Sequence, residues 1–286
     1  MNPAEKLDRV TERFVAQSMR AYTNAHQLFS WPAAPPANSL AMSEQLLPLA
    51  GHPLFGVLDD EQRSQLALRE AVNFFSLNIA GERELMSGLA QRLFVGRPAN
   101  LSRYLQLFLQ EENAHTAVFA RFCLDYAGFI DPDRQVRFPR AFRPGEEEFL
   151  FFARVLIFEE IAHFYNRRVA ADDAVWPLVR DIHRYHAEDE ARHIAFGRLL
   201  IEEMWDRFGA QWSLSDRLQI ASYVVRYKSS VQRSYVNPAV FNCLGPLATP
   251  SLRDEILASS HWIALAVESS RSVTAWLTRI GVLNAQ

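Results

Sequence analysis

The sequence lacks the features of a secreted, membrane-bound or nucleic-acid-binding protein. Its 286 residues include only two cysteines, and residues 1–20 carry charges where a secretory signal would need an apolar run. No stretch approaches the roughly 18 uninterrupted apolar residues of a membrane span. Thirty basic and thirty-three acidic residues nearly balance, so no strong field would attract nucleic acid or an anionic membrane. We therefore expect a soluble, cytoplasmic protein that binds neither.

Patterns typical of β-strands are also scarce, and most prolines cluster in residues 32–53 and 132–144. The long blocks outside these clusters repeat apolar residues three and four apart, which is the period of an amphipathic helix. We expect four long helices at 59–93, 99–126, 146–171 and 178–208, a shorter one at about 4–26, and further helical blocks at 215–236 and 251–283. The sequence thus predicts one all-α domain, residues 1–286, in which additional N- and C-terminal helices flank a four-helix bundle at about 59–208.

The connection between the second and third long helices, residues 128–144, is longer than a turn. Extended at about 3.3 Å per residue, it would span roughly 55 Å, more than the roughly 40 Å of the helix that follows. A long crossover at this place is typical of ferritin-like bundles. In those bundles, glutamates from two helices and a Glu-x-x-His motif from each of the other two face a pair of metal ions.

Two copies of Glu-x-x-His lie in separate expected helices, at Glu112–His115 and Glu190–His193. Residues three apart share one helix face, so each pair can present a carboxylate oxygen and an imidazole nitrogen to one ion. A third copy begins at Glu160 and shows how readily this spacing arises, since a single copy is more often a solvated pair. Two copies beside two more helices with glutamates in apolar stripes favour a metal centre, because burying unpaired carboxylates costs several kcal/mol each.

The two remaining long helices each carry a pair of candidate glutamates. Glu82 shares its stripe with apolar residues, whereas Glu84 has small and polar neighbours, so we expect Glu82 to point inward. Glu159 is favoured over Glu160 on weaker grounds, because both have apolar neighbours. Glu84 and Glu160 therefore remain alternative ligands.

Further histidines flank these glutamates. His186 lies one turn before Glu190 on the same face, so it is expected to supply a third imidazole, with an outer hydrogen-bonding role as the alternative. His183 lies two turns from Glu190 and is expected to be an outer group or to lie at the end of the bundle. His163 is either a ligand or a partner that orients a carboxylate.

The predicted ligand set is Glu82, Glu112, His115, Glu159, His186, Glu190 and His193. Carboxylates and imidazoles suit iron or manganese, and the lack of a cysteine cluster disfavours structural zinc or an iron–sulfur site. Four glutamates balance two ferrous ions and leave a positive centre after oxidation, which oxide from dioxygen can neutralise. We therefore expect two iron ions, dioxygen as co-substrate and an external electron donor.

This arrangement resembles the diiron arylamine N-oxygenases. In that family a glutamate is followed about thirty residues later by an acidic-Glu-x-x-His motif, twice, with an added histidine four before the last glutamate. Here the first copy is Glu82 with residues 111–115, where Glu111 replaces the expected aspartate, and the second is Glu159 with residues 189–193 and His186. The resemblance covers residues 82–193. It implies oxidation of the nitrogen of a small, aromatic amine toward a nitro group, with His186 and Glu159 in catalytic roles.

Other functions remain open on the sequence. A C–H hydroxylase or desaturase could use the same ligands, and a metal-binding scaffold without turnover is the alternative from another class. A radical-storing subunit of ribonucleotide reductase is disfavoured, because Phe119 stands where that protein would carry a tyrosine. Homodimerisation is expected as the commonest assembly. An arginine that binds a substrate carboxylate cannot be chosen from thirty basic residues.

Overall fold

The computed structural model describes residues 3–21, 24, 27–37, 39–94, 99–133 and 141–283. The longer helices are α1 (Pro3–Ala21), α2 (Asp60–Ala90), α3 (Ala99–Ala127), α4 (Glu146–Ala171), α5 (Pro177–Phe208), α6 (Leu214–Ser234), α7 (Leu252–Ala258), α8 (Ser260–Ser269) and α9 (Arg271–Arg279). Short 3-10 helices lie at η2 (Glu44–Leu46), η3 (Pro48–Gly51), η4 (Pro53–Val57), η5 (Gly209–Gln211) and η6 (Val240–Leu247). The described residues contain no β-strand beyond one isolated bridge between Leu40 and Val175, so the all-α prediction is confirmed.

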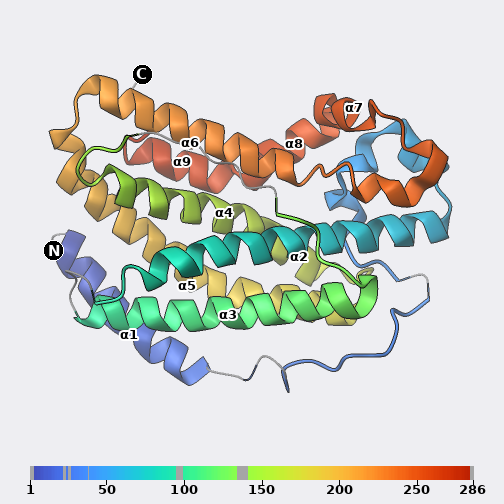
Figure 1. The fold of residues 1–286 in the computed structure, drawn as a ribbon, viewed down its shortest axis with the longest axis horizontal. Helices are drawn as coiled ribbons and strands as arrows, with labels where there is room; N and C mark the ends of the chain where they lie inside the picture. The colour runs from blue at the N-terminus through green and yellow to red at the C-terminus, as the bar shows by residue number, and fades with distance from the viewer. Residues whose placement is uncertain are drawn as a thin grey trace.

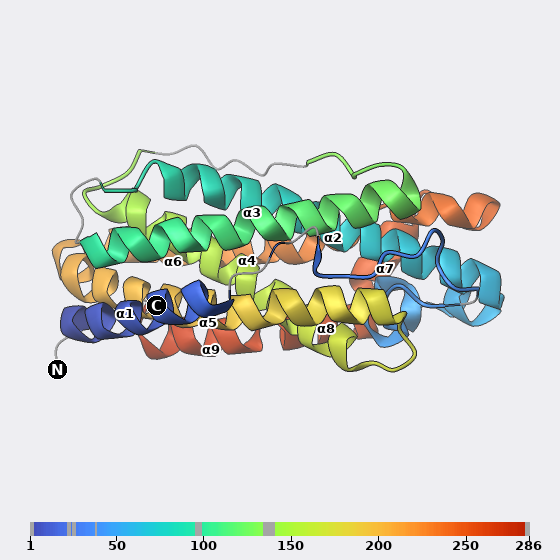
Figure 2. The same ribbon diagram turned by 90° about the horizontal axis from the view of Figure 1, so that it is seen from below.

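Helices α2, α3, α4 and α5 form the central bundle, in which α2 packs on α3 and α4 packs on α5 (Figure 1). Helix α6 covers α4 from outside, and α8 and α9 pack on the same helix. Helix α1 contacts α3 and α5 at one end of the bundle (Figure 2), and η3 packs with α7 and α8 at the other end. The additional N- and C-terminal helices therefore wrap a four-helix core, as the sequence predicts. No helix in the described residues is both long enough and apolar enough to cross a membrane.

Local sequence signals fix where the long helices begin. Helix α2 starts with a capping box, in which the Gln62 backbone N–H donates to the Asp59 carboxylate and the Asp59 backbone N–H donates to the Gln62 side-chain oxygen. Ser213 and Asp216 make the same pair at the start of α6. Pro177 occupies the first turn of α5, where its missing N–H is not needed.

The structure differs from the sequence prediction near both ends of the chain, and the predicted crossover lies partly outside the described residues. The block 251–283 is helical but broken into α7, α8 and α9. The break between α7 and α8 falls at Ser259, whose side chain accepts from the Trp262 backbone N–H and starts a new helix. Helix α1 ends at Ala21, and residues 22, 23, 25 and 26 of the expected helix 4–26 lie outside the described residues. The crossover expected over 128–144 cannot be followed either, since residues 134–140 lie outside the described part.

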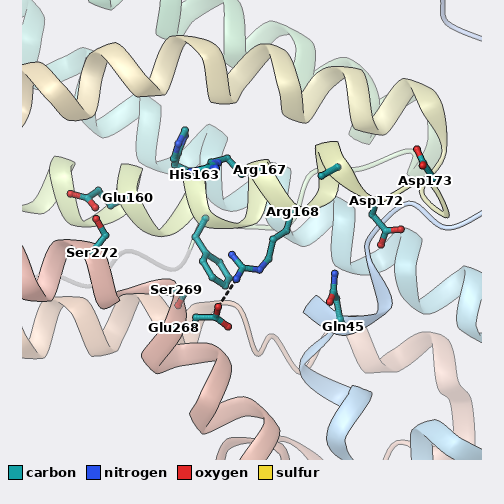
Figure 3. A pocket seen from close by; sticks show the side chains of 12 residues that line it. Gln45, Glu160, His163, Arg167, Arg168, Asp172, Asp173, Glu268, Ser269 and Ser272 are labelled. Carbon is teal, nitrogen blue, oxygen red and sulfur yellow. Dashed lines mark hydrogen bonds and ion pairs between the residues drawn. The ribbon is translucent and has the colours of Figure 1, made fainter.

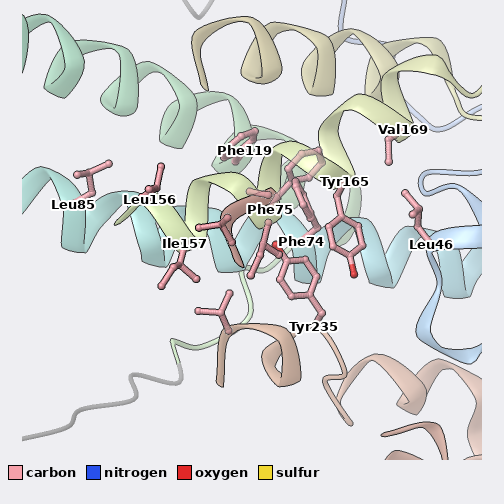
Figure 4. Close-up of a cluster of buried hydrophobic side chains, with 14 of the residues drawn as sticks. Leu46, Phe74, Phe75, Leu85, Phe119, Leu156, Ile157, Tyr165, Val169 and Tyr235 are labelled. Atoms are coloured by element: carbon pink, nitrogen blue, oxygen red, sulfur yellow. The ribbon is translucent and has the colours of Figure 1, made fainter. Parts of the chain in front are cut away.

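Aromatic side chains fill the interior between the four long helices (Figure 4). The Phe75 ring packs on Phe119 with centroids 4.9 Å apart and on Phe122 at the same separation. Helices α2 and α4 approach closely because Gly81 and Gly88 face aromatic rings, and a Cβ atom at either glycine would overlap the ring opposite. The rings belong to Phe158 and Phe151 respectively. This order shows that α2 and α4 run antiparallel where they meet.

Candidate metal centre

Each of the four long helices directs one glutamate into the interior. Glu82, Glu112, Glu159 and Glu190 come from α2, α3, α4 and α5 in turn, and the most exposed of them, Glu159, has only 2% of its surface accessible. Glu84, the alternative to Glu82, is exposed. Every helix therefore contributes one carboxylate to the same dry region.

Three histidines converge on these carboxylates. His115, His186 and His193 are at most 2% exposed. Three overlapping groups each bring ligand atoms within 4.8 Å of one another: Glu82, His115 and His186; Glu112, His115 and Glu190; and Glu159, His186 and Glu190. The remaining residue of the predicted set, His193, places Nδ1 2.8 Å from Glu112 Oε1 and 3.2 Å from Glu190 Oε2. The structure thus brings together all seven residues that the sequence singled out.

The two Glu-x-x-His copies support each other through crossed pairs. His115 turns Nδ1 toward Glu112 and Glu190, and its Nε2 lies 3.1 Å from Asp189 Oδ2, in the other copy. His193 likewise turns Nδ1 inward, and its Nε2 lies 2.8 Å from Glu111 Oε2. An acidic partner on the outer nitrogen of an imidazole orients the ring and makes it a better metal ligand.

One arginine holds both of these outer acids. Arg192 pairs with Asp189 on its own helix and with Glu111 on α3 at 2.8 Å. Burial raises the pKa of Glu111, but the hydrogen bond and charge of His193 outweigh burial and hold this pKa below its usual value. Glu111 therefore stays ionised and can replace the aspartate expected at this position. The sequence shows Glu111 and Asp189 as part of the motif. It does not show that each acid pairs with the histidine of the other motif copy.

His186 faces the glutamates with Nε2, whereas His115 and His193 face them with Nδ1. Its Nε2 lies 2.9 Å from Glu190 Oε1 and 3.5 Å from Glu82 Oε1, while the Asn166 amide lies 2.7 Å from its Nδ1. Asn166 also accepts from His183 Nδ1 at 2.7 Å. His183 is therefore an outer group that acts through Asn166. Sequence reasoning missed Asn166, which lies two turns after Glu159, on the same side of α4.

The buried carboxylates require a cation. Burial raises the pKa of Glu82 and of Glu159, and the neighbouring carboxylates Glu112 and Glu190 raise both values further. Both oxygens of Glu82 and Oε2 of Glu159 have no hydrogen-bond partner in the part of the chain that the structure describes. Among the described residues, no arginine or lysine forms an ion pair with either. Two metal ions fit this donor set, because carboxylate and imidazole atoms left without partners already converge there.

The third Glu-x-x-His copy lies on another face of α4. Glu160 accepts from Arg198 Nε at 2.8 Å and from Nη2 at 2.6 Å. His163 lines a cavity of about 620 Å³ together with Glu160, Arg167 and Arg168 (Figure 3), and it belongs to none of the three groups of converging ligand atoms. Glu159, not Glu160, therefore faces the centre.

A second cavity opens on the centre from outside the bundle. It is a groove of about 550 Å³ between α2, α4 and α6, and Glu159 is the one residue of the predicted ligand set among its described lining residues. A small molecule can therefore approach the converging ligands along α4, on the side of Glu159.

The bundle and its converging carboxylates and imidazoles define a ferritin-like dimetal-carboxylate protein. The sequence model of the P-aminobenzoate N-oxygenase AurF family matches residues 5–281, so the chain belongs to this family of diiron oxidoreductases. The family resemblance noted in the sequence is thereby confirmed over nearly the whole chain. The comparison with curated proteins gave no match.

Solved structures with the same fold are point mutants of an R2-like ligand-binding oxidase. One with an aerobically reconstituted Mn/Fe cofactor is 15% identical and has a TM-score of 0.51. Another with an aerobically reconstituted Fe/Fe cofactor is 16% identical with the same TM-score, and each comparison covers 98% of this chain and 94% of the other. At this identity the likeness establishes the ferritin-like fold.

Proposed function

We propose that Glu82, Glu112, His115, Glu159, His186, Glu190 and His193 hold two iron ions, and that the chain oxidises the nitrogen of a small aromatic amine. The observation that carries this proposal is the convergence of these seven buried side chains, with no compensating arginine among the described residues. Membership of the N-oxygenase family supports the choice of nitrogen as the acceptor.

The position of each residue determines its proposed role in the reaction. The ions would activate dioxygen, so that one oxygen atom joins the amine nitrogen and the other leaves as water, with two electrons from an external donor and two protons. Glu159 lies where the groove meets the centre, so the amine nitrogen of a bound substrate would lie beside it. The dry surroundings keep solvent from this place. We further propose a homodimer that works in the cytoplasm.

A direct test begins with measuring the iron content of each chain. The loaded protein is then reduced without air, mixed with air, and followed by absorption spectroscopy with and without an aromatic amine. We expect an oxygen-dependent absorption band that decays faster with the amine, together with hydroxylamine or more oxidised products. Decay indifferent to every amine would favour a C–H hydroxylase or desaturase. No reaction with oxygen would favour a metal-binding scaffold.

The third imidazole can be tested by itself. His186 adds a neutral nitrogen donor to one ion, and we propose that this donor directs the reactivity of the centre toward amines. His186→Ala should lower nitrogen oxygenation at least about tenfold and iron content far less, because six proposed ligands remain. His163→Ala is the matched control on the other face of α4. Unchanged amine turnover in His186→Ala would remove the proposed role.

A further inference from the structure

The Asn166 side chain bridges two buried histidines of helix α5. Its amide lies 2.7 Å from His186 Nδ1 and 2.7 Å from His183 Nδ1, and all three side chains are fully buried. Asn166 itself belongs to α4, so the bridge joins two helices of the bundle. His186 is in the proposed ligand set and His183 is not. The amide therefore connects an expected metal ligand to a histidine outside the centre.

The two ends of the amide make these histidines complementary. A side-chain amide accepts hydrogen bonds at its carbonyl oxygen and donates them from its NH2 group, and a neutral imidazole carries one proton, on either Nδ1 or Nε2. His183 is neutral, because its ring is buried against Phe74 and Phe75, where a charged imidazolium would be costly. Since each end of the Asn166 amide faces one Nδ1 atom, one of these atoms carries a proton and the other does not. This holds whichever way round the amide lies.

Metal binding selects one of the two arrangements. In the structure the amide oxygen faces His183 and the NH2 group faces His186, which places the His186 proton on Nε2. That nitrogen is the one directed at the carboxylates, 2.9 Å from Glu190 Oε1. A neutral imidazole binds a metal ion through the nitrogen without a proton. Binding through Nε2 therefore moves the His186 proton to Nδ1, and the amide oxygen must turn toward it.

Turning the amide changes His183 as well. The NH2 group then faces His183 Nδ1, which must accept, so the His183 proton moves to Nε2. No other described residue forms a hydrogen bond with this buried atom. The rings of Phe74 and Phe75 lie with centroids 4.9 and 5.1 Å from the His183 ring, and aromatic rings are weak acceptors for an N–H group. Each imidazole keeps one proton throughout, and only its position changes.

We propose that Asn166 is a positioning residue whose amide turns when metal binds, so that His186 and His183 always hold opposite tautomers. The proposal rests on the proposed function, because it takes His186 Nε2 as a metal ligand. In the metal-bound form the Asn166 oxygen accepts from His186 Nδ1 and fixes the ring toward the ions, while His183 accepts the NH2 group. His115 and His193 are held instead by the carboxylates of Asp189 and Glu111. The third imidazole thus differs from the other two in having a neutral partner.

The first test reads the tautomers directly. Protein labelled with a heavy nitrogen isotope in its histidines is studied by NMR without metal and after loading with zinc, a diamagnetic ion that takes the same kinds of ligand. Without metal we expect the proton on Nδ1 of His183 and on Nε2 of His186, and with zinc we expect both positions to be reversed. Asn166→Asp offers two acceptor oxygens, so His183 should keep its Nδ1 proton in both states.

The second test measures zinc affinity by competition with a chelator. Asn166→Leu is similar in size but has no acceptor, so it should weaken zinc binding about 10- to 100-fold. Asn166→Asp keeps an acceptor for His186 Nδ1 and should bind zinc at least as tightly as the unmodified protein. Asn242→Leu, at an exposed position in η6, is the control and should leave the affinity unchanged.

The outcomes separate this inference from the proposed function. The same tautomer in His183 and His186, or a His183 tautomer that zinc leaves unchanged while His186 responds, would overturn the role of Asn166. Equal losses of affinity in Asn166→Asp and Asn166→Leu would overturn it too. If zinc does not bind at all, the metal centre fails, although opposite tautomers in the metal-free protein would still support the complementary pair. If the tautomers reverse as expected but no amine is oxidised by the iron-loaded protein, the role of Asn166 stands and the proposed function fails.

Discussion

Two faces of helix α4 carry the same kinds of side chain in different surroundings. Glu159 faces the interior, where it meets other carboxylates and imidazoles and one of its oxygens has no hydrogen-bond partner. Glu160, the next residue, is almost as buried but is paired with Arg198, and His163 beside it lines a separate cavity (Figure 3). Glu160 and His163 have the same Glu-x-x-His spacing as Glu112 and His115 at the centre. What distinguishes the metal centre is that its acids face imidazoles and one another, with no arginine or lysine among the described residues paired to Glu82 or Glu159.

A third buried carboxyl is compensated in yet another way. Glu70 lies in α2, 5% exposed, with one oxygen that has no hydrogen-bond partner. Burial raises its pKa to about 8, although the charge of Arg69 opposes the shift, so a proton neutralises this group at neutral pH. Metal ions at the centre, Arg198 at Glu160 and a proton at Glu70 are thus three ways of burying a carboxyl group, and each predicts a different response to substitution.

The largest expected difference is in metal content. Glu190→Ala should reduce bound iron to below about a tenth, because Glu190 belongs to two of the three groups of converging ligand atoms. Glu160→Ala should leave the iron content unchanged, because Arg198 already neutralises Glu160. Elemental analysis of both purified variants makes the measurement. Equal iron loss in the two variants would remove the distinction between the two faces of α4.

A smaller effect is expected from the outer acids. Asp189→Asn removes the charge that holds His115 Nε2 and should weaken metal binding about 10- to 100-fold. Asp173→Asn is the control, because that side chain is 98% exposed and pairs with Arg180, away from the centre. Competition with a chelator gives the two affinities. Equal affinities in Asp189→Asn and the unmodified protein would show that the crossed pairs do not support the ligands.

The proton on Glu70 predicts a pH dependence of stability. Its folded-state pKa of about 8 lies above the ordinary value of 4.5, so between these pH values the unfolded chain releases a proton that the folded chain keeps. Stability is therefore full below about pH 4.5 and falls as pH rises toward 8. Glu70→Gln should lack this fall and be roughly 3 to 4 kcal/mol more stable relative to the unmodified protein at pH 8 than at pH 5. Denaturant unfolding at both pH values measures it, and an unchanged difference would show that Glu70 is ionised.

The smallest expected effect is the loss of stability when Arg198 is replaced. Arg198→Ala leaves Glu160 buried without its partner and should cost about 1 to 2 kcal/mol, since the arginine side chain is itself 31% exposed. Iron content should not change. Arg184→Ala, which breaks an exposed pair with Asp181, should cost less than about 0.5 kcal/mol. Loss of iron in Arg198→Ala at unchanged stability would mean that Glu160 belongs to the centre.

Much of the site follows from helical periodicity. Glu82 lies in an apolar stripe and Glu84 does not, and the structure buries the first and exposes the second. The sequence distinguishes Glu159 from Glu160 less well, because both have apolar neighbours, and the structure buries both. Their difference lies in Arg198, which comes from another helix at a separation that local sequence patterns do not reveal.

Most features that the sequence did not show depend on contacts between distant segments. The pairing of His115 with Asp189 joins α3 to α5, and Asn166 joins α4 to two histidines of α5. The break at Ser259 was missed because a serine within an apolar helical pattern does not distinguish a new N-cap from a solvated position.

Anomalous diffraction at the iron edge from crystals of the iron-loaded protein tests the central claim most directly. The account predicts two peaks per chain inside the bundle, both among Glu82, Glu112, Glu159 and Glu190, and none beside Glu160 and His163. A single peak, or iron bound in the cavity of Figure 3, would contradict it.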